Sequence, residues 1–281
     1  MKHGPVGRIA AYTAMLLVAA FVLTPLLWLA IMSISSTNDL TTLPLRWLPQ
    51  TLDLSRYGRL LSVAANSQGA NFLHALRNTL TVAAGTTVLS FSLAVPAAWV
   101  FSRIPGRHGV LLYLIVGSYM LPPILFVVPM YRILSALDLL NTTTALILTD
   151  TTIVLPFATW LLKGGIDAIP ADLEEAAAID GARLWRTLVS VTLPLARPII
   201  GTTVLLAVLI VWDEFLYALL FTSNDRAQTL TVAIANLATG RITDYGLLAA
   251  AGILAAAPPV LIGLSLQRTL VAGLTGGAVK G

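Results

Sequence analysis

Three acidic side chains lie inside long apolar stretches of this sequence: Asp150, Asp213 and Glu214. A charge at the depth of a lipid bilayer costs at least about 2.5–3.5 kcal/mol, so each carboxylate should face a cavity or find a partner. Carboxylates accept hydrogen bonds from hydroxyl groups, and the face of the neighbouring Trp212 could stack on the C–H face of a sugar. These four residues therefore predict a polar contact site for a hydroxyl-bearing solute.

The positions of the acids in their segments support a shared depth. With a helical rise of 1.5 Å per residue, Asp213 lies about 4–5 Å from the centre of the apolar segment 199–221, and Asp150 lies about as far from the centre of segment 143–162. The two segments would run in opposite directions, so both offsets point to the same side. The structural alternative is that Asp213 and Glu214 cap a break in their helix or bond to a partner protein.

Other kinds of chemistry have no residues to carry them. The chain has no cysteine, and His3, His74 and His108 are too far apart in flanks and loops to form a zinc site. The polar run from Thr149 to Thr152 has no histidine nearby, and no phosphate-binding loop of the G-x-x-x-x-G-K-[ST] type occurs. Basic residues do not cluster with aromatics, which excludes a nucleic-acid partner. We therefore expect a non-catalytic chain that binds no metal, cofactor or ATP itself.

The elements that must position these acids are membrane helices. The 281-residue chain is 57% hydrophobic and only 11% charged, which is typical of a membrane protein. Segments of about 20 apolar residues can cross a bilayer. The sequence predicts an all-α integral membrane protein with six spans, and the first is too long for the apolar core of a cleaved signal peptide. The spans are expected at 9–32, 79–101, 110–131, 143–162, 199–221 and 247–267.

Several spans contain proline, which neighbouring helices or water-filled cavities can accommodate. We favour packing geometry over gating as their role. These prolines are Pro25, Pro96, Pro122, Pro123, Pro129, Pro156, Pro258 and Pro259. The similar runs Leu121–Leu125 and Ala257–Leu261 are interpreted as convergent kinks and not as an internal repeat.

The distribution of Lys and Arg predicts the orientation, because cytoplasmic loops are enriched in both. Ten of the 17 basic residues lie on the side of the N-terminus: Lys2, Arg8, Arg103, Arg107, Lys163, Arg183, Arg186, Arg197, Arg268 and Lys280. The other side holds Arg46, Arg56, Arg59, Arg77, Arg132, Arg226 and Arg241. Both termini and the 163–198 loop are therefore expected in the cytoplasm, and the 33–78 loop outside the cell.

The 163–198 loop is polar and predicts a helix-turn-helix. Asp172 is expected to cap the first helix, with Glu175 three residues later, and Gly181 to end it in the left-handed conformation. A second helical segment is expected from Leu184 to Val191. Three alanines between these ends favour the helix and leave a surface that another protein can approach closely. The residues alone allow either a docking helix or a solvated connector.

The loop resembles a known motif. Glu175-Ala176-Ala177, Gly181 and the run Val191-Thr192-Leu193-Pro194 are spaced as in the EAA loop of bacterial ABC-importer permeases, which often have Ile at the position of Val191. In that family the loop is the coupling helix and binds the cytoplasmic ATPase subunit. The resemblance implies ATPase contacts for Glu175, Ala176, Ala177, Asp180, Gly181, Leu193 and Pro194.

Three further stretches resemble the carbohydrate-uptake branch of these permeases, in particular the maltose-transporter G subunit. They are Leu139–Thr142, Trp212–Phe215 and the C-terminal residues Gly273–Gly281, although members commonly have Asn at the position of Asp213. The resemblance implies that the tail 271–281 reaches the ATPase interface through Gly276, Gly277 and Lys280. By itself, so glycine-rich an end would be expected to be disordered.

The resemblance also implies the assembly. The chain would pair with a second related permease in the bacterial cytoplasmic membrane, with two copies of an ATPase that bind ATP and Mg²⁺ and an extracytoplasmic solute-binding protein. The binding protein would contact the 33–78 and 222–246 segments. The solute stays open between a disaccharide, an oligosaccharide and a glycerol-phosphate-type ligand, and the absence of Lys and Arg from the spans disfavours an acidic one.

Two functions compete at this point. The first is the permease subunit of an ATP-driven importer, which works by alternating access. The second is a proton-coupled secondary transporter that uses Asp150, Asp213 and Glu214 as a relay. The second function explains the acids but leaves the 163–198 loop and the tail without a role.

Overall fold

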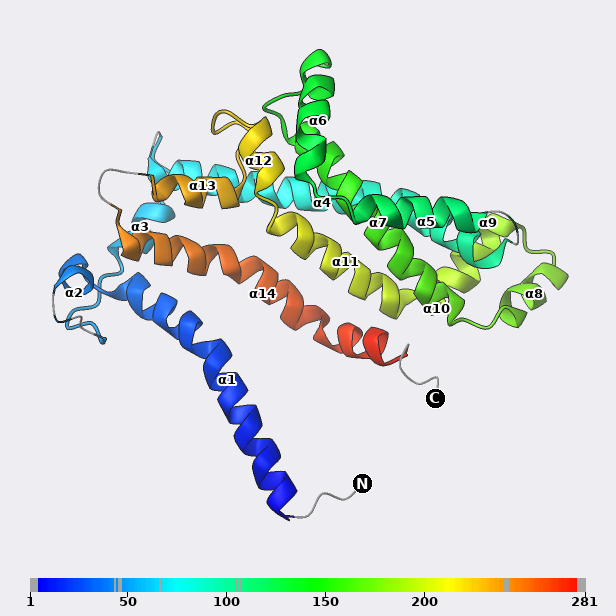
Figure 1. Ribbon diagram of the computed structural model, residues 1–281, viewed down its shortest axis with the longest axis horizontal. Coiled ribbons are helices and arrows are strands. Elements are labelled where there is room, and N and C mark those ends of the chain that lie inside the picture. Colours follow the sequence, from blue (N-terminus) through cyan, green and yellow to red (C-terminus); the bar gives the residue numbers. More distant parts are fainter. Residues whose placement is uncertain are drawn as a thin grey trace. The chain divides into compact units, whose positions relative to one another are not determined.

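The computed structural model describes residues 5–42, 44, 47–65, 67–104, 106, 108–239 and 243–276, without the side chains of residues 5, 6, 108 and 266–276. These residues are mostly helical, as predicted (Figure 1), and the one β-type pairing among them is an isolated antiparallel bridge between Ser35 and Leu52. The chain divides into two compact units. The first comprises Met1–Leu73 and Ala233–Ala257, and the second comprises His74–Val232 and Pro258–Gly281.

The first unit begins with the long apolar helix α1 (Pro5–Ile34), which is followed by the short helices α2 (Thr37–Thr41) and α3 (Ser55–Leu60). Residues 7–27 of α1 are exposed in this chain. A continuous exposed apolar surface of this kind suits a lipid or a partner membrane protein. At the other end of α1, the rings of Trp28 and Trp47 lie 5.2 Å apart.

The second unit is a bundle in which α7 (Thr143–Asp167) occupies the centre, in contact with α5 (His108–Tyr119), α11 (Arg197–Trp212) and α12 (Leu216–Phe221). Small residues allow close approach of its helices. A Cβ on Gly165 of α7 would lie 2.5 Å from a side-chain carbon of Ile199, and a Cβ on Gly85 would lie equally close to Ile147. The other helices are α4 (Gln68–Arg103), α6 (Ile124–Ala136), α8 (Asp172–Ile179), α9 (Leu184–Thr187), the π-helix η1 (Leu188–Thr192) and α10 (Leu193–Leu195).

Three helices belong partly to each unit: α4, whose residues 68–73 lie in the first unit, α13 (Leu230–Leu237) and α14 (Tyr245–Gly276). Four helices of the described chain are long and apolar enough to cross a membrane. The number rises to six if each of two bent helix pairs is one span, namely Gly109–Tyr119 with Ile124–Ala136 and Leu184–Leu195 with Arg197–Trp212. The six predicted spans all lie on helical segments.

The structure changes the predicted bounds in three places. Helix α4 begins at Gln68 and not at 79, because residues 68–78 continue the helix with one buried face that includes Phe72 and Ala75. The predicted span 110–131 is broken between Tyr119 and Ile124, where α5 and α6 meet at 97°. The predicted span 199–221 is likewise interrupted, between Trp212 and Leu216.

Candidate functional site

Helix α8 forms the first half of the predicted helix-turn-helix. It begins at Asp172 after Ala171, and no side chain caps its first turn, so the prediction that Asp172 is the cap is wrong. Asp172 is instead the first helical residue. It stands in the first turn with Glu174 and Glu175, where negative charge is favourable next to the positive end of the helix dipole.

The C-terminal end of α8 confirms the predicted role of Gly181. Gly181 has a φ of +82°, in the left-handed region. Its N–H donates to the carbonyl oxygen of Ala178 at 3.0 Å, and the N–H of Ala182 donates to that of Ala177 at 2.9 Å. These two bonds form a Schellman motif, which ends the helix and turns the chain towards α9.

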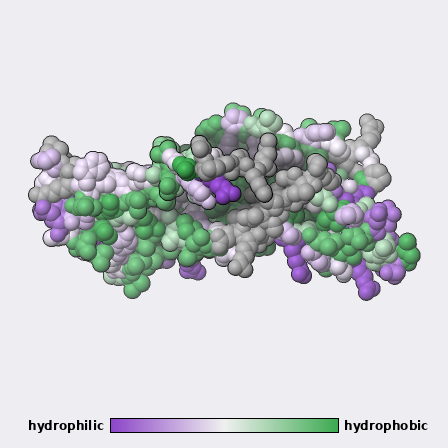
Figure 2. All heavy atoms as spheres, turned by 90° about the horizontal axis from the view of Figure 1, so that it is seen from below, coloured by the Kyte–Doolittle hydropathy of each residue, from purple (hydrophilic) through white to green (hydrophobic). Residues whose placement is uncertain are grey.

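Most of α8 and α9 faces away from the rest of the unit. Glu175, Ala176, Asp180 and Gly181 are exposed, and Ala177, Leu193 and Pro194 are half-buried. Large apolar side chains are exposed on the same two helices and the turn between them, among them Leu173, Ile179, Leu184 and Trp185, and Ile179 is 87% exposed. Figure 2 shows hydrophobic and hydrophilic residues side by side at the end that carries α8 and α9. Such a surface suits a protein partner.

Glu174, next to the exposed Glu175, points inward and is only 8% exposed. Its carboxylate accepts hydrogen bonds from Trp99 Nε1 at 3.1 Å, from Arg103 Nε at 3.1 Å and from Thr192 Oγ1 at 2.7 Å. Sequence reasoning missed this residue. The one signal in the sequence was the pair of adjacent glutamates, since neighbouring positions on a helix point in different directions.

A second polar site lies where the two interrupted spans meet. The carboxylate of Glu214 accepts hydrogen bonds from the N–H groups of Tyr217 at 2.7 Å and Ala218 at 3.0 Å, and thereby caps the N-terminus of α12. This is the helix break that the structural alternative predicts for Glu214. Asp213 is exposed in this chain, whereas Trp212 is only 5% exposed, so its ring is covered in this conformation.

Asp150 completes this polar site from α7. It is 2% exposed, and its Oδ1 atom has no hydrogen-bond partner among the described residues. The carboxyl groups of Asp150 and Glu214 lie close enough to interact electrostatically, and both lie close enough to influence the Tyr217 hydroxyl. That hydroxyl donates to the carbonyl oxygen of Pro123 at 3.3 Å, in the break between α5 and α6. The two breaks and the two acids therefore belong to one site.

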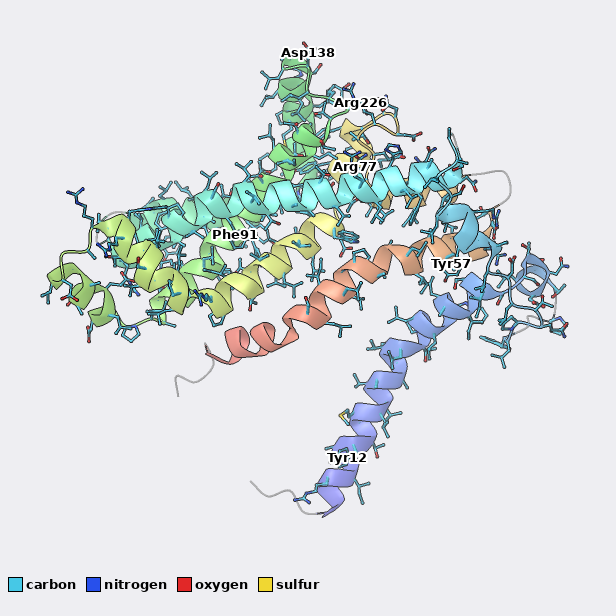
Figure 3. The ribbon with its side chains drawn as sticks, turned by 180° about the vertical axis from the view of Figure 1, so that it is seen from behind. Tyr12, Tyr57, Arg77, Phe91, Asp138 and Arg226 are labelled. Carbon is cyan, nitrogen blue, oxygen red and sulfur yellow. The ribbon has the colours of Figure 1, made fainter. Side chains whose placement is uncertain are left out.

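The other end of α12 is held by Asn141, which has a φ of +60°. Its N–H donates to the carbonyl oxygen of Phe221 at 2.9 Å, and its side-chain oxygen accepts from the N–H of Ser223 at 3.1 Å. From the first third of α4, Asn78 Nδ2 donates to the carbonyl oxygens of Arg226 and Gln228, near the labelled Arg77 and Arg226 in Figure 3. The end of α12 and the segment that follows it are thus held by Asn141 and Asn78.

The first unit contains a separate cluster around Arg56, which is 0% exposed. Its Nε donates to Asp244 Oδ1 at 3.1 Å, its Nη2 to Thr37 Oγ1 at 3.1 Å, and its Nη1 to the carbonyl oxygen of Ser35. Next to it, the hydroxyl of Tyr57, labelled in Figure 3, donates to Ser33 Oγ at 2.7 Å. The cluster joins the end of α1, the 33–78 loop and the residue before α14.

Asp244 is the N-cap of α14 as well as the partner of Arg56. Its Oδ1 accepts from the N–H of Leu247 at 3.0 Å, and Arg59 Nη2 lies 3.1 Å from its Oδ2. Burial alone would raise the pKa of Asp244, but the Leu247 N–H and the guanidinium groups of Arg56 and Arg59 outweigh it, so the pKa is lowered. The charged carboxylate is therefore the form that the folded cluster favours.

Comparison with known proteins shows what these parts belong to. Residues 90–276 match the family described as the binding-protein-dependent transport system inner membrane component. The chain belongs to this family. The match covers both interrupted spans, α8 and the polar site, and it confirms the resemblance to ABC-importer permeases.

Several relatives match the permease along most or all of its length. The trehalose/maltose transport permease MalG of Thermococcus litoralis is 33% identical over all of both chains. The sulfoquinovosyl glycerol transport permease SmoH of Agrobacterium fabrum is 34% identical over 92% of this chain and 89% of its own. The trehalose transport permease SugB of Mycobacterium tuberculosis is 34% identical over 98% of this chain and 99% of its own.

The fold of the permease is also found in a solved structure. A chain of a bacterial ABC transporter involved in the import of the acidic polysaccharide alginate aligns with a TM-score of 0.77, at 22% identity, over 95% of this chain and 99% of that one. Since the identity is low, this likeness shows the fold alone.

The remaining predicted site residues lie at the end of the permease chain. Gly276 is the last residue of α14, and Gly277 and Lys280 lie outside the described residues. In the part of the chain that the structure describes, no group of three or more His, Cys, Asp or Glu side chains could hold a metal ion.

Proposed function

We propose that this permease is one of the two membrane subunits of an ATP-driven importer for a sugar or sugar-like solute. It is not itself catalytic. Its partners are a second related permease, two copies of an ATPase that bind ATP and Mg²⁺, and an extracytoplasmic solute-binding protein. The names of the relatives MalG, SugB and SmoH support the sugar class, and the family description supports the binding-protein partner.

One observation carries the coupling part of this proposal. In the loop 163–198, α8 exposes Asp172, Glu175 and most of its alanines together with the apolar Leu173 and Ile179, and only Glu174 of α8 is buried. A connector between two spans needs no exposed Ile or Trp. An ATPase that binds this surface covers them, and movement of its binding cleft then moves the ends of α7 and α11.

The polar site of Asp150, Glu214 and Tyr217 supports a solute path through the second unit. In membrane transporters, interrupted helices at the polar centre expose backbone groups that can bind a solute, and two interrupted spans meet here. In this proposal the permease forms half of the path, and alternating access exposes Asp150 and Trp212 to the solute. Asp213 faces the partner permease or the path.

The proposed orientation places both termini, the loop 163–198 and the tail 271–281 in the cytoplasm. The tail then contributes Gly276, Gly277 and Lys280 to the ATPase interface. The segment 33–78, which the Arg56 cluster joins to Asp244, lies outside the cell and receives the solute-binding protein. Lipid surrounds the exposed face of α1.

The experiment is a pull-down of the tagged permease from its native membrane in mild detergent, with the partners identified by mass spectrometry. We expect an ATPase and a second permease. A variant with Glu175→Lys and Gly181→Pro should lose the ATPase and keep the second permease. Asp225→Lys, an exposed charge reversal after α12, is the matched control and should lose neither.

Recovery of the parent permease without an ATPase or a second permease would overturn the proposal. Helix α8 would then be a connector between two spans and not a docking helix. The proton-coupled carrier would then have to be tested by uptake driven by a pH gradient. Family membership favours the ATP-driven importer over that carrier.

A further inference from the structure

The two adjacent glutamates of α8 point in different directions. Glu175 is exposed, and Glu174 is buried against the end of α4 and the segment η1. The carboxylate of Glu174 meets three donors, one from the indole of Trp99, one from Arg103 and one from Thr192. It is therefore the single polar attachment of α8 to the membrane helices within the described side-chain bonds.

Arg103 extends this attachment to α7. While its Nε donates to Glu174, its Nη2 donates to the carbonyl oxygens of Ile166 at 3.0 Å and Ile169 at 2.8 Å. Those carbonyls belong to the last turn of α7 and the residues after it. The neighbouring Ser102 Oγ donates to Asp167 Oδ1 at 2.6 Å, which ties α4 to α7 a second time.

The arrangement has the properties of a rigid joint. The side chains of Arg103 and Glu174 are 13% and 9% exposed, so solvent screens their attraction little. A buried ion pair repays its desolvation only in good geometry with the remaining lone pairs satisfied, and here Trp99 and Thr192 supply the further bonds. Such a network adds little to net stability but favours one relative arrangement of the groups that it joins.

We propose that Glu174 is the positioning residue through which the movement of α8 reaches the membrane helices. Glu174, Arg103, Trp99 and Thr192 make α8, η1 and the cytoplasmic ends of α4 and α7 move as one body. The adjacent Glu175 remains available to a partner. This inference rests on the proposed function only where it assigns that partner; the rigid body itself can be measured in the permease alone.

The test measures a distance between two spin labels. The chain contains no cysteine, so Ile104→Cys at the end of α4 and Ala178→Cys near the end of α8 give two unique labelling sites. Both side chains are exposed, and neither residue is among the expected ATPase contacts. We expect one narrow distance distribution in the full-length permease in lipid, unchanged when the co-purified ATPase is given ATP and Mg²⁺. A shift of this distance with nucleotide would overturn the proposal, because α8 would then move independently of α4.

Variants of the joint separate it from the docking surface. Glu174→Ala should lose the single narrow distribution even without an ATPase, and Glu174→Gln, which keeps the shape and one acceptor oxygen, should broaden it less. Glu175→Ala is the matched control and should leave the distribution unchanged. If Glu174→Ala fails to fold, Thr192→Val removes one bond of the carboxylate and should broaden the distribution on its own.

A functional readout follows in the assembled transporter. Glu174→Gln should keep the ATPase bound and its ATP hydrolysis close to the parent rate, while solute-binding protein no longer stimulates that hydrolysis. Glu175→Ala should instead lose bound ATPase. Loss of ATPase in both variants, with narrow label distances in both, would contradict a positioning role for Glu174. Absence of any ATPase in the parent would contradict the proposed function and leave the label distances as the test of the joint.

Discussion

The guanidinium group of Arg56 and the carboxylate of Asp244 meet at 3.1 Å across 188 residues of sequence, with the arginine completely buried. This pair fixes the start of α14 to the loop after α1. A second carboxylate also faces the guanidinium group of Arg56: Asp53 Oδ2 lies 3.9 Å from Nη1. Asp53 and Asp244 therefore share one buried cation, and we expect the stability of the first unit to depend on this group of three charges.

Removal of Asp244 should destabilise the first unit. Asp244→Ala leaves a buried cation with weaker compensation, and we expect a loss of about 3 kcal/mol in the free energy of unfolding, the lower end for a broken buried pair. The measurement is a denaturant titration in detergent followed by loss of helical signal. Asp225→Ala, in an exposed loop, is the control and should change the value by less than about 0.5 kcal/mol. Equal values for the two variants would contradict the assignment.

The same cluster predicts an acid limit of stability. The folded state lowers the pKa of Asp244, for the reasons given above, and of Asp53, chiefly through hydrogen bonds from Ser55. The stabilisation from a carboxylate with a lowered pKa is complete above its ordinary value of 3.8 and is lost as the pH falls through the folded value.

We therefore expect the melting temperature of the purified permease to be insensitive to these two groups at neutral pH and to fall below about pH 4. Asp244→Asn should reduce the size of this fall, because one of the two titrating groups is gone. A parent and a variant with parallel melting curves from pH 6 to pH 3 would contradict the role of Asp244.

Gly246 is required for the close approach of Arg56. A Cβ at this position would lie 2.2 Å from Arg56 Cζ and 2.4 Å from Nη1, and the buried guanidinium cannot move without losing its bonds. Gly246→Ala should therefore cost about 1–3 kcal/mol as an overpacked site, measured by the same titration. In the same helix, a Cβ on Gly263 meets nothing within 4 Å, so Gly263→Ala should be neutral or stabilising. A neutral Gly246→Ala would show that Arg56 can rearrange.

The helix breaks show where prediction from sequence ends. Pro122-Pro123 and Pro258-Pro259 stand in similar local sequences, yet the first pair separates α5 from α6 at 97° and the second lies inside the continuous helix α14. The local sequence predicts a possible helix break at both proline pairs. At the first, the hydroxyl of Tyr217, 94 residues away, bonds to the carbonyl of Pro123, and no local pattern reveals this partner.

The end of α8 was predictable because its cause is local. Gly181 follows an alanine-rich helix, and only glycine adopts its φ of +82° at little cost. The start of α8 was predicted wrongly, since Asp172 and Glu175 match a capping box while the chain begins the helix one residue earlier than that motif requires. The inward direction of Glu174 depends on Trp99 and Arg103, which are 75 and 71 residues away.

Gly181 offers a direct test of the geometry of the loop. Gly181→Ala places an L side chain in the left-handed region and should cost the end of α8 about 1–2 kcal/mol. In the proposed importer the expected result is weaker retention of the ATPase during purification, with Gly181→Asn less affected because Asn tolerates this conformation. The measurement is the ratio of ATPase to permease in the purified complex.

The control for this series is Gly164 of α7, where an added Cβ meets nothing within 4 Å. Gly164→Ala should retain the parent amount of ATPase. Full retention in Gly181→Ala would show that the turn after α8 can be rebuilt without consequence, and the Schellman geometry would then carry no function.

The two buried acids of the polar site should differ in their effect on stability: Glu214 should stabilise the fold, and Asp150 should not. Glu214 caps α12, so Glu214→Ala should lower the free energy of unfolding by about 1 kcal/mol. Asp150 Oδ1 is buried without a partner among the described residues, and such a group is costly to bury, so Asp150→Asn should leave stability unchanged or raise it.

If Asp150 accepts a solute hydroxyl, Asp150→Asn should nevertheless abolish or strongly reduce uptake of labelled sugars, tested with a panel of disaccharides and oligosaccharides. Asp213→Asn, at an exposed position of the same site, is the matched control and should transport like the parent. A variant Asp150→Asn that transports normally but unfolds more easily would make Asp150 structural. It would also leave the solute path to residues of the partner permease, because Glu214 is already occupied by the backbone of α12.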